Sequence, residues 1–560
     1  MMRLPAIAVA LVVSTSISGA QSSRQDTVAR VDSVFSGFTT TTPGCAVGIS
    51  RHERTVLAKA YGMANLEYDV PLTPESIIEA GSVAKQFTAA AILLLAQQGK
   101  LSLDDPVRKH IRELPDYGAR LTLRHMINHT SGLRDWGTVA AVEGWPRGSR
   151  VHTHDHVLDI VTRQRSLNFP PGTEYLYSNT GYNLLAIIVE RVSGRSFADF
   201  TRTEIFEPLG MTRTSWRDDY TRIVKGRAAA YSQGRNGFRL DMPFENVHGN
   251  GGLLTTVEDL LRWSANFDRG QVGGPVFLRE QVRPGRLTSG REIEYAAGLG
   301  ISRYRGIAQV SHSGATAGYR AFLTRYPEHG LTVAILCNHA GAQAVDLGHR
   351  VSDIFLGLTP EVAEAPKAVA VPESALLGRA GLYRDSVTGE PVRISARKDT
   401  LIDAGGNATI PLSPTLFQRR NGSRLLFELA ADGRTRAMRL IQPGGDTTTF
   451  LPVDAHVPTG DELAAYAGTY RSDEAATTFR IVVESGKLFL RQRPALSFAL
   501  RPAYRDAFEV PTGDLVRFIR DGSGKVTEMS LFLGRVRDLR FVRECGVTEK
   551  ESGMRKADCK

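Results

Sequence analysis

The stretch GSVAKQFTAAAILLLAQQG, residues 81–99, predicts a helix that opens on a chemical motif. Apolar side chains dominate it, and Gly99 marks its end. Ser82 and Lys85 lie three residues apart, and positions i and i+3 share one side of a helix, so the Lys85 amine can reach the Ser82 hydroxyl. A serine on the first turn also lies at the positive end of the helix dipole, which favours a developing oxyanion. The structural alternative is that Ser82 caps the helix and Lys85 is solvated.

The Ser-x-x-Lys pair carries little weight alone. The chain contains 36 serines and 12 lysines among 560 residues, so chance predicts about one such pair. A second copy is present at Ser395 and Lys398, where strand and turn patterns replace the helical one. A serine on a strand and a lysine in a turn need not share a face, so we expect no chemistry there.

A second candidate element, Tyr177-Ser178-Asn179, is the only Tyr-x-Asn in the chain and follows a Pro-Pro-Gly break. We expect it at the apex of a loop that leads into a helix over 180–192. A tyrosine near an ammonium group can shuttle a proton from a serine to a leaving group, and Asn179 can hold an amide or the lysine. The alternative is a turn with a packed aromatic ring and an Asx cap.

The third element is His312-Ser313-Gly314, at the end of a strand predicted over 308–312. Gly314 has no side chain to block a ligand along the sheet edge, so a substrate can add there as an extra strand. The backbone N–H groups of Ala315 and Ser82 would then form an oxyanion hole.

Strand patterns lie at both ends of the region before Pro360 and helical patterns lie between them. The strand-like runs cover 44–49, 55–61, 308–312, 319–326 and 331–337, and the helical patterns cover 82–98, 180–192 and 256–267. We therefore expect an α/β domain, in which an antiparallel sheet recruits both ends of its chain and is flanked by helices, with a helical subdomain.

A sequence repeat follows a proline-rich segment. Residues 380–384 match 467–471 at an offset of 87, and the same offset places Ile394 on Ile481. Alternating strands and polar turns continue each copy, which predicts two all-β, barrel-like modules or two halves of one barrel. The predicted organisation is an export signal at 1–20, an α/β domain at 21–362, a linker at 363–375, β modules at 376–455 and 460–545, and a tail at 546–560.

The first twenty residues predict export. A short positive start, an apolar run over 4–13 and small residues at 18–20 are typical of a cleaved signal peptide. No cysteine stands directly after the cleavage site, and no later stretch reaches about 18 uninterrupted apolar residues. We expect a periplasmic or secreted protein that begins at Gln21 and has no stable membrane anchor.

Cysteine content and charge exclude other classes. Four cysteines are too few for a disulfide miniprotein and lack zinc spacing. We expect Cys45 and Cys337 to be buried as small hydrophobes in core strands, whereas Cys545 and Cys559 are candidates for a bond in the tail. The net charge of +10 is scattered without a basic run, so we expect a solvated surface and no nucleic-acid partner.

The order of Ser82, Tyr177 and His312 resembles the serine β-lactamase and penicillin-binding-protein-like hydrolases. These include class C β-lactamases, D-Ala-D-Ala carboxypeptidases, D-aminopeptidases and related esterases. The resemblance covers about residues 31–358. The supporting phrases are 129–133, 251–253 with Asp259, and 298–300.

The resemblance implies roles for the three elements. Ser82 is the acylated nucleophile, Lys85 takes its proton, and Tyr177 is the acid/base for the leaving group and the deacylating water. The implied substrate-binding residues are Asn179, His312, Ser313, Gly314 and Ala315. Whether Lys85 or Tyr177 is the acylation base stays open, and the pattern implies neither a metal nor a cofactor.

One position departs from the β-lactamase pattern, which usually has lysine where this chain has His312. Histidine titrates near pH 6.5, so we expect any grip on a substrate carboxylate to weaken above that pH. We therefore expect an exported serine hydrolase that forms an acyl-enzyme on amide or ester bonds of a small molecule or short peptide. A true β-lactamase and a catalytically silent sensor or binding protein are the alternatives, and the oligomeric state stays open.

A histidine cluster offers a competing metal site. His152, His154, Asp155 and His156 are similar to the motif of metallo-hydrolases, but the spacing differs by one residue and no strand leads in. We expect Thr153 to cap a helix there instead.

Overall fold

The computed structural model describes residues 25–359, 366–403, 405–443, 446–493 and 495–544. These residues belong to two compact units. The first unit comprises 1–105, 182–286 and 292–362, and the second comprises 106–181, 287–291 and 363–560. The predicted export signal, the Cys545 and Cys559 candidates and the tail lie outside the described residues.

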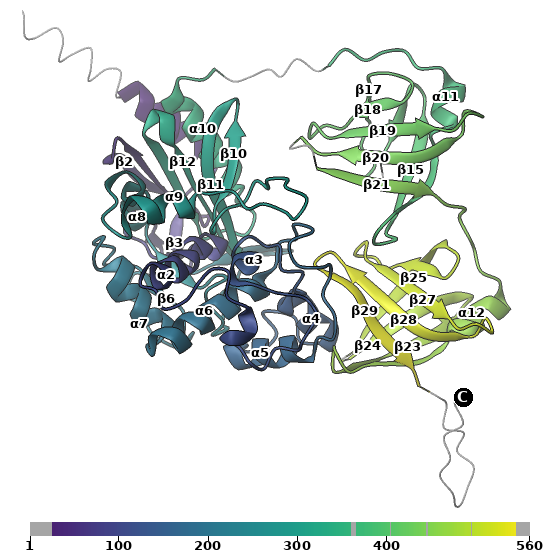
Figure 1. The fold of residues 1–560 in the computed structure, drawn as a ribbon. Helices are drawn as coiled ribbons and strands as arrows, with labels where there is room; N and C mark the ends of the chain where they lie inside the picture. The colour runs from purple at the N-terminus through teal and green to yellow at the C-terminus, as the bar shows by residue number, and fades with distance from the viewer. Residues whose placement is uncertain (1–24, 360–365, 404, 444–445, 494, 545–560) are drawn as a thin grey trace, which may run out of the picture. The chain divides into compact units, whose positions relative to one another are not determined.

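A six-stranded antiparallel sheet forms the centre of the first unit (Figure 1). Its order is β10-β11-β12-β13-β1-β2, so the first strand pairs with the last and the two ends of the domain meet in one sheet, as predicted. The strands are β1 Cys45–Arg51, β2 Arg54–Tyr61, β10 Gly300–Tyr304, β11 Ile307–Thr316, β12 Tyr319–Tyr326 and β13 Leu331–Cys337.

Both faces of this sheet are buried, and successive side chains of β1 and β13 point into the cores on its two sides. Val47 and Ile335 pack with Leu347 of helix α10 (Ala344–Leu356) in one core. On the other face a Cβ added to Gly48 would lie 3.0 Å from Val257 Cβ of helix α8 (Val257–Arg269), so glycine allows the helix to approach closely. The helices that lie wholly or mostly within this unit are α2 Lys85–Gln97, α6 Asn179–Ser193, α7 Phe197–Thr201, α8 Val257–Arg269, α9 Gly274–Gln281 and α10 Ala344–Leu356.

Three small sheets complete the first unit. Their strands are β3 Met63–Asn65 with β4 Val70–Pro71, β5 Ile78–Glu79 with β9 Leu253–Thr255 and β6 Ser215–Trp216, and β7 Tyr231–Gly234 with β8 Gly237–Leu240. None of the helices in the described part of the chain combines the length and apolarity that a bilayer crossing requires.

The helix predicted over 82–98 is present, but its first turn is not α-helical. Ser82 lies in a 3₁₀ turn, η1 Gly81–Ala84, and the α-helix begins only at Lys85. Gly81 has φ +51°, and a Cβ on it would lie 2.5 Å from the Ala315 nitrogen. The close approach of β11 therefore imposes a tight turn that the apolar pattern does not reveal.

We expected Cys45 and Cys337 to be buried without a bond between them, and this expectation is wrong. Cys45 and Cys337 are fully buried, as predicted, but they face each other on β1 and β13 and form a disulfide. Their Cα atoms are 4.0 Å apart and 292 residues separate them in sequence. Only the pairing register of the two strands brings them together, and the sequence does not show that register.

The helical part of the second unit contains α3 Leu123–Ile127, α4 Trp136–Glu143 and α5 His154–Arg163. Thr153 is the N-cap residue of α5, as predicted, and its backbone N–H donates to His156 Nδ1 at 3.1 Å.

Two separate β modules follow, each with eight strands (Figure 1). The first is a sheet of order β16-β15-β14-β21-β20-β19-β18-β17, and the second is a closed barrel, β22 to β29. The strands of the first module are β14 Gly381–Asp385, β15 Pro391–Arg397, β16 Thr400–Ile402, β17 Ile410–Pro411, β18 Leu416–Gln418, β19 Arg424–Leu429, β20 Thr435–Ile441 and β21 Thr447–Pro452. Those of the barrel are β22 Gly468–Ser472, β23 Thr477–Glu484, β24 Lys487–Gln492, β25 Leu496–Tyr504, β26 Ala507–Glu509, β27 Leu515–Arg520, β28 Val526–Leu533 and β29 Val536–Arg543.

The 87-residue repeat extends to matching local structure. A short helix precedes each first strand, α11 Glu373–Leu377 in one module and α12 Gly460–Tyr466 in the other. The Tyr383 hydroxyl donates to the Arg379 carbonyl at 2.7 Å, and the equivalent Tyr470 hydroxyl donates to the Tyr466 carbonyl at 2.8 Å. The same tyrosine thus fastens the helix to the strand in both copies.

Candidate active site

Ser82 and Lys85 form a hydrogen-bonded pair at the start of α2. Lys85 Nζ donates to Ser82 Oγ at 3.2 Å and to the Asn250 carbonyl at 2.6 Å, and its side chain is fully buried. Lys85 Nζ also lies 5.5 Å from the centroid of the Tyr182 ring. Two oxygens and an aromatic ring therefore hold the amine beside the hydroxyl.

A buried ion pair supports the turn that carries Ser82. Arg217 Nε donates to Glu79 Oε2 at 2.8 Å, and both side chains are at most 1% exposed. Glu79 Oε1 also accepts the Gly252 N–H at 3.2 Å, and the Ala80 N–H donates to the Leu253 carbonyl at 2.8 Å. This network ties the residues before Ser82 to the segment that follows Asn250.

The backbone of strand β11 lies close to the backbone of the turn that carries Ser82. A Cβ on Gly314 would lie 2.0 Å from the Ala80 carbonyl oxygen and 3.1 Å from the Ser82 nitrogen. The pairing of β10 with β11 ends at Ser311, so β10 leaves the edge from His312 onward open. Glycine is thus required at 314, and the backbone of β11 lies against the turn that carries Ser82.

His312 is held as a buried neutral ring. Its Nδ1 lies 2.6 Å from the Ser313 carbonyl, which can only accept, so Nδ1 carries the proton; Nε2 then accepts from the Tyr295 hydroxyl at 3.0 Å. Burial and repulsion from Lys85 lower the pKa of His312 to about 4, although the bond to Ser313 opposes this. His312 therefore does not titrate near pH 6.5, as its residue type suggested, and does not offer a cation to a carboxylate at neutral pH.

Tyr177 and Asn179 belong to the second unit. Tyr177 lies half-buried on the loop before α6, with the His129 ring at a centroid distance of 4.1 Å. The Asn179 N–H donates to Asp135 Oδ2 at 2.8 Å, and the Ser178 N–H donates to His129 Nδ1 at 3.2 Å. The loop predicted for the Tyr-x-Asn element is therefore fastened to the residues before α4.

The other Ser-x-x-Lys copy lies where the repeat places it. Ser395 is in β15, and Lys398 follows the strand in a turn with φ +53°. Strand and turn replace the helical spacing that brings Ser82 and Lys85 together.

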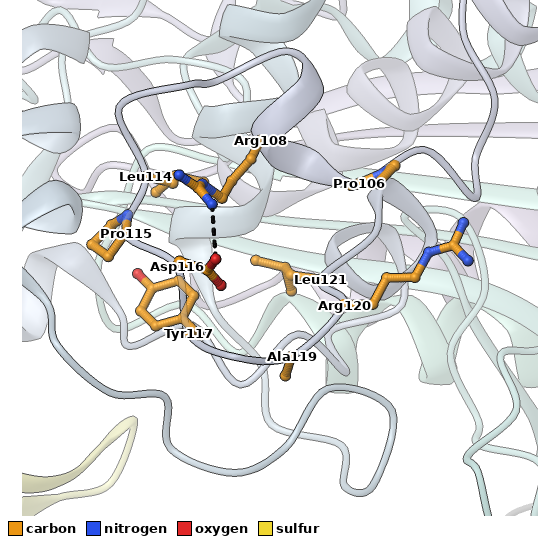
Figure 2. A pocket seen from close by; sticks show the side chains of 9 residues that line it. All are labelled: Pro106, Arg108, Leu114, Pro115, Asp116, Tyr117, Ala119, Arg120 and Leu121. Atoms are coloured by element: carbon orange, nitrogen blue, oxygen red, sulfur yellow. Dashed lines mark ion pairs between the residues drawn. The ribbon is translucent and has the colours of Figure 1, made fainter.

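A separate cavity of about 200 Å³ lies in the second unit and contains none of the predicted site residues (Figure 2). Its main charged groups pair with each other, since Arg108 Nη1 lies 3.2 Å from Asp116 Oδ2. Its lining residues are Pro106, Arg108, Leu114, Pro115, Asp116, Tyr117, Ala119, Arg120 and Leu121.

Sequence reasoning missed several groups around Ser82 and His312. Asn250 acts through its backbone carbonyl, which any residue type supplies, so only its place before the 251–253 phrase could have pointed to it. Glu79 precedes the motif by three residues, but its partner Arg217 lies 138 residues away. Tyr295 pairs with His312 from a loop that carries no motif.

A sheet that pairs the first strand of the domain with its last, and a Ser–Lys pair beside strand β11, define the α/β domain of the serine β-lactamase fold. The β-lactamase family model matches residues 31–354, and the chain belongs to that family. Its C-terminal all-β region follows this match.

Curated relatives are similar over different lengths. A D-aminopeptidase of Gluconobacter oxydans (strain 621H) is 25% identical over 523 residues, which are 90% of this chain and 96% of the relative. Penicillin-binding protein 4* of Bacillus subtilis (strain 168) is 33% identical over 300 residues, 50% of this chain and 64% of the relative. The first similarity therefore includes the β modules.

Solved structures share the fold. The octameric penicillin-binding protein homologue from Pyrococcus abyssi superposes with a TM-score of 0.53 at 23% identity, covering 85% of this chain and 99% of that one. A D-amino acid amidase from Ochrobactrum anthropi SV3 gives a TM-score of 0.52 at 21% identity, covering 59% and 99%.

Proposed function

We propose that this protein is a serine hydrolase that forms an acyl-enzyme at Ser82 and cleaves amide or ester bonds of small molecules or short peptides. The observation that carries the proposal is the buried Lys85 amine 3.2 Å from the Ser82 hydroxyl. The named activities of relatives, D-aminopeptidase and D-amino acid amidase, favour the amidase or peptidase type.

The reaction assigns one role to each group. In its unprotonated form the Lys85 amine takes the Ser82 proton while Oγ attacks the substrate carbonyl, and the N–H groups of Ser82 and Ala315 stabilise the oxyanion. Collapse breaks the bond to the amine or alcohol, which takes a proton from Tyr177. Water then attacks the acyl-enzyme and gives a proton to Tyr177, and Lys85 returns its proton to Ser82 Oγ as the acid leaves. Asn179 positions the substrate.

The edge of β11 fits an extended substrate better than a lactam carboxylate. His312 is neutral, so the permanent cation that β-lactamases place in the third motif is missing here. Ser313 and Gly314 instead present an open strand edge to a peptide or amide. Peptide or ester cleavage is therefore favoured over lactam hydrolysis.

The test is active-site labelling with matched serine variants. A fluorophosphonate should add its mass to the peptide containing Ser82, and Ser82→Ala should abolish labelling and lower hydrolysis of D-alanine p-nitroanilide or p-nitrophenyl acetate by up to about 10⁶-fold. Ser395→Ala removes the serine of the other Ser-x-x-Lys copy and should change neither. Equal turnover by wild type and Ser82→Ala would refute the proposal.

We propose further that the protein is exported. The predicted signal at 1–20 supports this, and so does the Cys45–Cys337 disulfide, since such bonds persist in oxidising compartments. The intact mass of protein recovered from periplasm or medium should correspond to a chain that begins at Gln21. A chain that keeps Met1 and stays in the cytosol would contradict export.

A further inference from the structure

A hairpin of the closed barrel contacts the loop that carries Tyr177. Strands β28 and β29 are joined by a turn that contains Arg535. The Arg535 carbonyl accepts from Asn168 Nδ2 at 3.0 Å and from the Asp135 N–H at 3.3 Å. The Arg537 N–H donates to Asn168 Oδ1 at 2.7 Å. The turn is therefore docked through its backbone.

The Arg134 side chain also holds the β28–β29 hairpin in place. Its side chain is fully buried and donates to the Arg537 carbonyl at 3.1 Å and to the Asp538 carbonyl at 2.9 Å. It also pairs with Glu474 of the barrel at 2.6 Å. Buried, charge-assisted bonds of this kind hold the hairpin in one position.

The Arg535 side chain takes no part in the backbone docking bonds and lies against the Tyr177 ring. Its guanidinium carbon lies 4.9 Å from the Tyr177 ring centroid, and its Nη1 lies 4.0 Å from Asp135 Oδ2. The Asp135 carboxylate is also engaged by the Asn179 N–H, and the His129 ring packs against Tyr177. Arg535 and His129 therefore contact the Tyr177 ring, and the Asp135 carboxylate lies beside the Arg535 guanidinium.

We propose that Arg535 is a positioning residue through which the barrel orients Tyr177 and stabilises its phenolate form. The inference rests on the proposed function, in which Tyr177 transfers protons. A guanidinium on an aromatic ring restrains that ring, and a nearby cation favours an ionised phenol. The same charge acts on the adjacent phenol: burial raises the pKa of Tyr175 to about 12, and Arg535 opposes the rise.

The exposure of Arg535 sets the scale of the effect. The side chain is 45% exposed, so solvent screens its charge and the effect on turnover should be moderate. Because the docking bonds use the Arg535 carbonyl, a side-chain substitution leaves them intact. Function and docking can therefore be separated in the full-length protein.

The experiment compares Arg535→Gln and Arg535→Lys with Arg537→Gln as the matched control. Arg537 lies on the same hairpin, but its guanidinium pairs with Glu174 at 2.8 Å and packs on Phe169. With D-alanine p-nitroanilide at pH 7, Arg535→Gln should lower kcat about tenfold and raise the pH of half-maximal kcat by about one unit. KM should stay within about twofold, and Arg535→Lys and Arg537→Gln should retain most of the turnover.

A double-mutant cycle shows whether Arg535 acts through the tyrosine. In a Tyr177→Phe background, Arg535→Gln should cause no further loss of kcat. The same fold-loss with and without the tyrosine hydroxyl, an equal loss in Arg537→Gln, or an unchanged pH profile in Arg535→Gln would overturn the inference. If these results occur while fluorophosphonate still labels Ser82, only the role of Arg535 fails; if wild type is not labelled, the proposed function fails as well.

Discussion

Replacing His312 by glutamine tests whether this residue is a neutral ring at the substrate edge. Glutamine is uncharged at every pH and can accept from the Tyr295 hydroxyl in place of His312 Nε2. The substitution therefore removes the titration of His312 while it keeps a polar group in the same place.

The magnitude follows from the depressed pKa of His312, about 4 in the folded protein against 6.5 for an ordinary histidine. Well above pH 6.5 His312 is neutral in both the folded and the unfolded protein, so it does not change the free energy of unfolding. As the pH falls from 6.5 towards 4, the unfolded chain binds a proton that the folded protein does not, so stability is lost. The loss at pH 5 is about 2 kcal/mol and approaches about 3 kcal/mol below pH 4.

Hydrogen–deuterium exchange of peptides from β11 measures this difference locally. Between pH 7.5 and pH 5, after correction for intrinsic exchange rates, wild type should lose about 2 kcal/mol more opening free energy than His312→Gln. His339 and His349 also have lowered pKa values through burial, but both proteins contain them, so their contributions cancel. The same pH dependence in both proteins would show that His312 is not held neutral.

Two further substitutions test the frame around the nucleophile. Gly314→Ala puts a Cβ 2.0 Å from the Ala80 carbonyl oxygen, so it should displace the Ser82 turn and slow fluorophosphonate labelling about 10²-fold; Gly37→Ala, which meets only open space, should not. Glu79→Gln leaves the buried Arg217 charge without its carboxylate and should lower the unfolding free energy by about 3–5 kcal/mol, measured as exchange protection of α2 peptides. A Gly314→Ala protein that labels at the wild-type rate, or unchanged protection in Glu79→Gln, would contradict this account.

Much of the fold could be predicted because it depends on patterns that are local in sequence. The strand runs at both ends of the domain and the helical runs between them correspond to β1, β13 and α8. The 87-residue offset predicted the repeated modules from matching residues alone, and in the structure Tyr383 and Tyr470 make the same hydrogen bond in each copy. Periodicity and self-similarity need no knowledge of tertiary contacts.

Features that depend on register or on backbone groups could not be predicted. The Cys45–Cys337 bond requires that β1 and β13 pair with these residues directly opposite, and many registers satisfy the same apolar pattern. The carbonyl of Asn250 binds Lys85, yet every residue has a carbonyl. The 3₁₀ turn at Ser82 arises from contact with β11, which overrides the helical propensity of the segment.

The surroundings of Tyr177 show most clearly where residue patterns stop being informative. Ser82 and Lys85 are neighbours in sequence, so their chemistry can be recognised from spacing, whereas Arg535 is one of 57 arginines and lies more than 350 residues from the tyrosine. Nothing in the composition of the β28–β29 turn distinguishes it from other polar turns. Its role follows from the backbone bonds to Asn168 and Asp135, which place one guanidinium on one ring. A β module that repeats its neighbour in sequence can therefore differ from it in function through a single docked turn.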